Sequence, residues 1–189
     1  MNLMQLGHPL IPSLKHMRDV EHFVQSRYPV GILLDVHLAR LGSVLKLAEA
    51  HHKRLILHVD LIAGLQSDEA GVEYVCQTFR PLGIISTRNK AIITARRKNV
   101  LAIQRVFLID SNALANSYKM MEQSNPDYIE LMPGILPDLI REVKEAAGKP
   151  ILTGGFLRTK EDVQRALAAG ASAVTTSNRY LWEQFAPPE

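Results

Sequence analysis

Short apolar runs alternate with amphipathic segments along the whole chain, at a spacing of roughly 24 residues, as in repeated strand–helix units. Runs of this kind predict parallel strands, and the segments after them predict helices that cover the sheet. The predicted strands are residues 10–15, 31–35, 55–60, 83–86, 101–108, 128–131, 150–153 and 173–175. The predicted helices are residues 17–25, 41–51, 68–78, 91–98, 112–123, 136–147, 160–169 and 179–185.

Eight such units with strands as short as four residues describe a compact (β/α)8 TIM-type barrel of parallel strands, near the lower end of the size range of this fold. An open, doubly wound sheet is the alternative. No Gly-x-Gly-x-x-Gly follows the first predicted strand, which argues against a dinucleotide-binding form of that sheet. No shift in composition marks a boundary, so we expect one domain over residues 1–189.

Several predicted helix ends carry their own signals. Thr159, with Asp162 three residues later, matches the spacing of a capping box. Asp68 opens an acid-rich helix start, where a side-chain oxygen and negative charge meet free backbone N–H groups. Gly148 and Gly170 come just after predicted helices, where a left-handed backbone favours glycine.

Polar side chains gather at the carboxyl ends of the predicted strands, which is where barrels of this fold bind ligands. The candidates for ligand contact are Lys15, Asp35, His58, Asp60, Gln104 and Glu130. Alternation along residues 55–60 places His58 and Asp60 in the barrel mouth. Charged groups are rarely buried without partners, so the cluster implies a ligand or mutual ion pairs. In the second alternative, Lys15 pairs with Asp35 or Glu130, and His58 is a hydrogen-bonded core histidine.

Two glycines end the seventh predicted strand, and hydroxyl side chains end the eighth. Loops after these two strands bind phosphate in many barrels, because glycine lets the backbone approach an anion and a helix start offers free N–H groups. The sequence therefore predicts a phosphate site at Gly154, Gly155, Thr176 and Ser177. The alternative is that the glycine pair only forms a tight turn.

The net charge of +3 is small, but the charge is unevenly distributed. Residues 74–109 contain no acid, and they carry the cations Arg80, Arg88, Lys90, Arg96, Arg97, Lys98 and Arg105. Uncompensated, these charges would create a field that attracts a polyanion. The alternative is that acids on neighbouring elements pair with them.

Other classes of protein find little support in the sequence. No apolar run approaches the ~18 residues of a membrane helix. The N-terminus lacks the charged-then-apolar pattern of a signal peptide, and the single cysteine, Cys76, excludes an internal disulfide, so we expect a cytoplasmic protein. We find no metal-ligand spacing, Walker loop or Gly-x-Ser-x-Gly, and so expect no metal, no cofactor and no catalytic residue.

With these segments in view, the chain from about Pro9 to Trp182 resembles the glycerol uptake operon antiterminator family, the glycerol-3-phosphate-responsive regulators of bacterial glycerol genes. Several blocks in the same order carry the resemblance, and together they are far more specific than any one of them. The blocks are residues 32–38 (ILLDVHL), 58–62 (HVDLI), 83–88 (GIISTR), 102–105 (AIQR), 154–159 (GGFLRT) and 173–178 (AVTTSN).

The resemblance implies a regulator rather than an enzyme, which binds glycerol 3-phosphate and then acts on the leader mRNA of glycerol-catabolic genes to prevent termination. On this resemblance, the six polar candidates are expected to contact the glycerol moiety of the effector. RNA contact is then expected at Arg88, Lys90, Arg96, Arg97 and Lys98. One rival is a barrel enzyme that uses acid–base chemistry on a small phosphorylated sugar. A second rival is a phosphometabolite sensor that acts through a protein partner, and the oligomeric state stays open.

Overall fold

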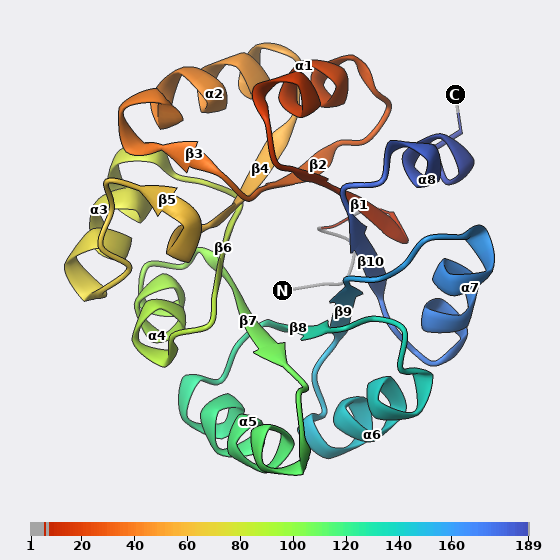
Figure 1. Ribbon diagram of the computed structural model, residues 1–189. Coiled ribbons are helices and arrows are strands. Elements are labelled where there is room, and N and C mark those ends of the chain that lie inside the picture. Colours follow the sequence, from red (N-terminus) through yellow and green to blue (C-terminus); the bar gives the residue numbers. More distant parts are fainter. Residues whose placement is uncertain (1–5, 7, 189) are drawn as a thin grey trace.

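A closed barrel of eight parallel strands, surrounded by helices, forms the structure (Figure 1). The computed structural model describes residues 6 and 8–188. Around the barrel the strands follow the order β1, β10, β9, β8, β7, β6, β4, β2, and β1 pairs with both β2 and β10. The predicted (β/α)8 fold is thereby confirmed, and the open sheet is excluded.

Each barrel strand is followed by a helix. The barrel strands are β1 (Leu10–Leu14), β2 (Val30–Leu33), β4 (Arg54–His58), β6 (Gly83–Ser86), β7 (Leu101–Phe107), β8 (Tyr128–Met132), β9 (Ile151–Gly154) and β10 (Ala173–Thr176). The helices are α1 (Met17–Gln25), α2 (Leu38–Ala50), α3 (Glu69–Phe79), α4 (Asn89–Arg97), α5 (Ser111–Ser124), α6 (Pro137–Ala147), α7 (Lys160–Ala168) and α8 (Arg179–Gln184).

Alternation along the strands builds two apolar layers. Side chains on the inner face, such as Ile56 and Ile103, fill the barrel interior. Side chains one position away, such as Leu57 and Ala102, pack against the helices together with residues such as Phe23. Because this parity continues to the end of each strand, it decides which polar residues face the barrel mouth.

The expected helix ends are confirmed. Thr159 accepts a hydrogen bond from the backbone N–H of Asp162, whose carboxylate accepts in return from the backbone N–H of Thr159. The carboxylate of Asp68 caps α3. Gly148 and Gly170 both have positive φ, at 60° and 103°.

One strand boundary differs from the prediction in a way that matters for the site. The strand predicted over residues 55–60 ends at His58, and a short 3-10 helix, η2 (Val59–Leu61), follows it. A two-stranded sheet of β3 (Val36–His37) and β5 (Ile62–Ala63) was not predicted, since two residues are too few to show alternation. Asp60 consequently leaves the inner face of β4.

No helix among the described residues is long and apolar enough to cross a membrane. The single domain expected over residues 1–189 includes residues 1–5, 7 and 189, which lie outside the described residues. Part of the N-terminal segment, for which no signal peptide is expected, therefore also lies outside them.

Candidate functional site

A cavity of about 290 Å³ opens at the carboxyl ends of the barrel strands. It is lined by Ser13, Lys15, Leu34, Arg105, Met132, Gly155, Phe156, Leu157, Thr175, Thr176, Ser177 and Asn178. The lining thus brings together four of the residues predicted to bind the ligand: Lys15, Gly155, Thr176 and Ser177. The cavity lies where barrels of this fold bind their ligands.

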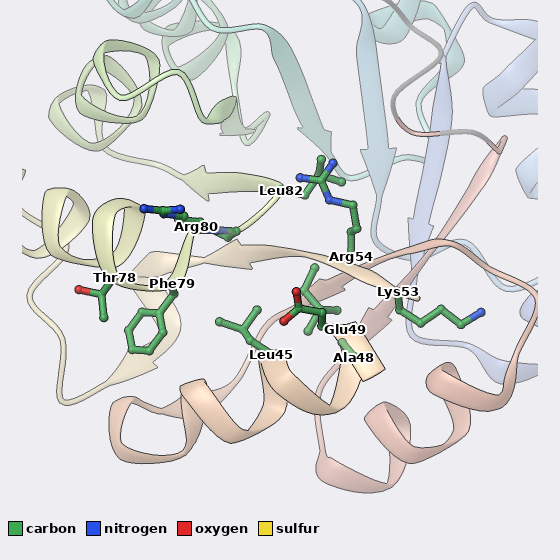
Figure 2. Close-up of a pocket in the computed structure, with 11 residues that line it drawn as sticks. Leu45, Ala48, Glu49, Lys53, Arg54, Thr78, Phe79, Arg80 and Leu82 are labelled. Atoms are coloured by element: carbon green, nitrogen blue, oxygen red, sulfur yellow. The ribbon is translucent and has the colours of Figure 1, made fainter. Parts of the chain in front are cut away.

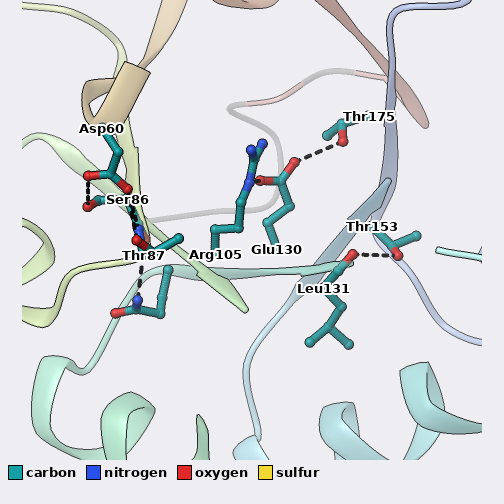
Figure 3. A network of polar contacts seen from close by, with 9 residues as sticks. Asp60, Ser86, Thr87, Arg105, Glu130, Leu131, Thr153 and Thr175 are labelled. Carbon is teal, nitrogen blue, oxygen red and sulfur yellow. Dashed lines mark hydrogen bonds and ion pairs between the residues drawn. The ribbon is translucent and has the colours of Figure 1, made fainter. Parts of the chain in front are cut away.

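A buried ion pair forms the floor of this region (Figure 3). The carboxylate of Glu130 is 0% exposed and accepts from Arg105 Nε at 2.7 Å and from Thr175 Oγ1 at 2.8 Å. A buried carboxylate is costly unless its oxygens are paired, and here both are engaged. Among the described residues, Arg105 Nη1 and Nη2 have no acceptor, so these donors remain for a ligand in the cavity.

Arg105 is the site residue that the sequence reasoning missed, because it was counted only within the basic stretch. The sequence held no clear signal, because apolar residues occupy both faces of this strand. Leu101 and Ile103 face the barrel interior, so the same parity places Arg105 on the inner face, directly beside Glu130 in the register of β7 and β8. Glu130 was expected to contact the ligand, but the structure makes it the partner that holds Arg105.

Gln104 does not face the barrel mouth, contrary to its predicted place. It lies between Ala102 and Val106, which pack toward the helices, and its Nε2 donates to the carbonyl oxygen of Ser86 at 3.3 Å. The reason is the same parity that turns Arg105 inward. Gln104 is therefore a buried structural residue on the outer side of the barrel wall.

Gly154 also has a different place from the one predicted. It is buried at the end of β9 and does not line the cavity. A Cβ at this position would lie 2.3 Å from Thr175 Oγ1, the hydroxyl that donates to Glu130. Gly154 thus allows the close approach of β9 and β10, and the candidate phosphate site narrows to Gly155, Thr176 and Ser177. Gly155 has φ of +81°, a left-handed conformation that favours glycine.

His58 ends β4 on the inner face and is 3% exposed. Its Nδ1 has no hydrogen-bond partner among the described residues. Burial, with the positive charge of Arg105, lowers the pKa of His58 to about 4, against the attraction of Asp60 and Glu130. The imidazole is therefore neutral near pH 7 and holds an unused polar atom inside the barrel.

Asp60 binds the loop before α4 instead of reaching the cavity (Figure 3). Its carboxylate accepts from Ser86 Oγ at 2.7 Å, from the Thr87 backbone N–H at 2.7 Å and from Thr87 Oγ1 at 3.0 Å. Burial alone would raise the pKa of Asp60, but these hydrogen bonds outweigh it and the pKa is lowered. The predicted contact of Asp60 with the glycerol moiety is not supported by this arrangement, because η2 turns the residue aside.

Lys15 and Asp35 are both exposed, but only Lys15 lines the cavity. Lys15 follows β1 directly and lines the cavity. Asp35 lies in the link between β2 and β3 and is not part of the lining. Neither the pair of Lys15 with Asp35 nor that of Lys15 with Glu130 is present, so the ammonium group of Lys15 has no acidic partner among the described residues.

Four of the seven cations in residues 74–109 are compensated, as in the alternative in which acids on neighbouring elements pair with them. Acids from neighbouring elements form the pairs Arg96–Asp127, Arg97–Glu69, Lys98–Glu73 and Arg105–Glu130. The five residues expected to contact RNA also divide between the two ends of α4. Arg88 and Lys90 lie at its start, while Arg96, Arg97 and Lys98 lie at its end. Arg88 and Lys90 are exposed cations on the same side of the barrel as the cavity.

A second cavity, of about 370 Å³, lies between α2 and α3 beside the amino ends of β4 and β6 (Figure 2). Leu45, Phe79 and Leu82 line it together with Arg54 and Arg80. In this fold the amino-terminal face serves stability rather than ligand binding, so the mouth cavity is the stronger candidate. Among the described residues, no three His, Cys, Asp or Glu side chains gather as metal ligands would.

Comparison with known proteins supports one family. Residues 10–182 match the family model described as glycerol-3-phosphate responsive antiterminator. The crystal structure of the glycerol uptake operon antiterminator regulatory protein from Listeria monocytogenes is 37% identical, with a TM-score of 0.94, over 97% of this chain and 99% of that one.

Two further relatives are more distant. A glycerol uptake operon antiterminator-related protein from Thermotoga maritima is 25% identical, with a TM-score of 0.83, over 93% of this chain and 98% of that one. The protein YgcP of Escherichia coli (strain K12) is 29% identical over 92% of this chain and 91% of its own length.

Proposed function

We propose that this chain, which belongs to the glycerol-3-phosphate responsive antiterminator family, binds glycerol 3-phosphate at the barrel mouth and then acts on the leader mRNA of glycerol-catabolic genes to prevent termination. The observation that carries the proposal is the cavity in which Lys15 and Arg105 face Gly155, Thr176 and Ser177. Two cations, backbone N–H groups and hydroxyls are the donors that a phosphate dianion requires. The protein would act in the cytoplasm, with the effector as its small-molecule ligand and without a cofactor.

The glycerol part of the effector would lie deeper in the barrel than the phosphate. His58 Nδ1 is a buried acceptor or donor without a partner, and it lies on the inner face with Arg105 and Glu130. A hydroxyl group of the effector would satisfy it, which removes the cost of an unpaired buried polar atom. His58 thus remains a candidate contact of the glycerol moiety. Gln104 and Asp60 instead form hydrogen bonds within the protein, to Ser86 and to the loop before α4.

RNA would contact the exposed start of α4. Arg88 and Lys90 lie there, and the backbone N–H of Arg88 donates to Ser86 Oγ, which donates in turn to Asp60. The loop that presents these cations is therefore held next to the barrel mouth. Effector and RNA would each raise the affinity of the other by the same factor, because their coupling is reciprocal.

An enzyme would need an acid or base within reach of its substrate. Glu130 is the buried carboxylate of the mouth, but Arg105 and Thr175 occupy both of its oxygens. Lys15 would remain in the cavity lining without a carboxylate beside it, and His58, which lies near Asp60 and Glu130, is not part of that lining. This arrangement favours binding over turnover.

Replacing Lys15 by methionine is expected to weaken glycerol 3-phosphate binding by roughly 10–100-fold, because one charge-assisted hydrogen bond to the phosphate is lost. Lys15 is exposed and has no acidic partner, so the thermal midpoint should stay unchanged. Isothermal titration calorimetry measures the affinity. Lys119→Met, at an exposed site on α5, is the matched control. Equal affinities of the two variants would place the phosphate elsewhere.

Titration of the protein with leader RNA of a glycerol operon, with and without glycerol 3-phosphate, tests the whole proposal. Binding should be tighter with the effector and should weaken steeply with salt, as counterions are released. Arg88→Ala/Lys90→Ala should lower the salt slope by about 2, while Lys119→Ala/Arg141→Ala, on α5 and α6, should not. Effector binding without any RNA affinity would instead favour a sensor that acts through a protein partner.

A further inference from the structure

Exposed apolar side chains concentrate on the face of the barrel that carries the cavity. Six of them lie at or after the carboxyl ends of β7, β8, β9 and β10: Phe107, Ile109, Ile135, Leu136, Phe156 and Tyr180. These four strands are consecutive in the sheet, so the loops after them are neighbours. We call the six residues the apolar collar. Their exposed fractions run from 37% to 85%, which is unusual for large apolar groups gathered in one region.

Phe156 shows that the collar is maintained against local preferences. It is 67% exposed and its φ is +59°, a left-handed conformation that bulky side chains rarely adopt. A polar residue, or glycine, would be more favourable at such a position in a monomer. Backbone strain of this kind usually indicates a functional requirement, and Phe156 also lines the mouth cavity.

The size of the collar can be compared with what a stable dimer needs. A fully exposed large apolar side chain presents roughly 180 Å², and the six are about six-tenths exposed on average, so the collar presents on the order of 600 Å². A standard interface takes about 800 Å² from each partner. About 65% of that area is apolar in homodimers, or roughly 500 Å². The collar therefore supplies the apolar area of one whole side of an interface.

We propose that two copies of this chain pair mouth to mouth through the apolar collar, so that each copy covers the cavity of the other. The charged groups around the collar suit a symmetric contact, in which one patch meets itself. Asp110 and Asp138 lie at the starts of α5 and α6, and Lys160 lies at the start of α7, so acids and cations are both available to the rim. A second copy is thus matched in area, and both signs of charge are present at the rim to meet it.

Pairing and effector binding are linked, because Phe156 belongs to both the collar and the cavity lining. Glycerol 3-phosphate should therefore change the dimerisation constant, and pairing should change effector affinity by the same factor. The effect of glycerol 3-phosphate on pairing rests on the proposed function, whereas the pairing itself does not.

Sedimentation velocity from 1 to 100 μM, first without effector, tests the pairing. The wild-type protein should shift from monomer to dimer within this range. Ile109→Ser should raise the dimer dissociation constant at least tenfold, since the most exposed collar residue is lost from both copies. The matched control is Ile93→Ser, because Ile93 is exposed on α4 outside the collar. Ile109 has so much of its surface in water that the variant should fold normally.

A wild-type protein that remains monomeric to 100 μM, or equal effects of Ile109→Ser and Ile93→Ser, would overturn the proposal. So would a monomeric wild-type protein whose RNA affinity falls on Ile109→Ser, because the collar would then bind RNA bases. Adding glycerol 3-phosphate is the second step. A dimer that is unaffected by the effector would leave the pairing intact and count against the proposed effector instead.

Discussion

Replacing Arg105 by methionine is expected to lower the free energy of unfolding by about 3–5 kcal/mol, as breaking a buried ion pair usually does. Glu130 is fully buried and would keep only the hydrogen bond from Thr175, so its charge would lose compensation. Methionine keeps the aliphatic stem of the arginine side chain, so little apolar packing is lost with the charge. Urea denaturation at pH 7.5 measures the change. Glycerol 3-phosphate binding should be lost in the same variant, because two donors leave the cavity.

A double variant separates the two roles of Arg105. In Arg105→Met/Glu130→Gln no charge remains buried, and the glutamine can still accept from Thr175, so most of the stability should return. Effector affinity should not return, since the cation is still missing. A loss of less than 1 kcal/mol in Arg105→Met would show that Glu130 finds other partners. Restored binding in the double variant would show that Arg105 does not touch the effector.

The periodicity of the sequence was enough to predict the barrel. Strand–helix units of regular spacing have few ways to pack, and the closed parallel sheet is the solution that leaves no exposed edge. The same alternation predicted that His58 and Glu130 face inward, as the structure places them. It could not separate Arg105 from Gln104 on β7, because apolar residues occupy both faces of that strand and only the structure shows that Leu101 and Ile103 are the inner ones.

The remaining errors come from features that no local pattern contains. Asp60 leaves the inner face because η2 interrupts the strand, and a single turn of 3-10 helix has no period to detect. The basic stretch looked uncompensated because its partners are distant in sequence. Glu69 and Glu73 belong to α3, and Asp127 precedes β8. Ion pairs between neighbouring helices become visible only when the fold places those helices side by side.

The stability of the protein should depend on His58 between about pH 6.5 and pH 4. The pKa of His58 is lowered to about 4 in the folded protein, against the ordinary value of 6.5 in the unfolded chain. In this interval the unfolded chain binds a proton that the folded protein does not, so stability falls as pH falls. The contribution is fully present above pH 6.5, and about 3 kcal/mol is lost by pH 4.

Comparing the wild-type protein with His58→Gln isolates this contribution. Glutamine stays polar but does not titrate, while His8, Asp60 and the other acids are present in both proteins. Urea denaturation at a series of pH values from 7.5 to 4 gives the free energy of unfolding of both proteins. As pH falls, this free energy should decrease more steeply in the wild-type protein, by up to the slope that corresponds to the uptake of one proton on unfolding. Parallel curves would mean that the imidazole is hydrated and titrates near its ordinary pKa, which would require water to enter the barrel beside Arg105 and Glu130.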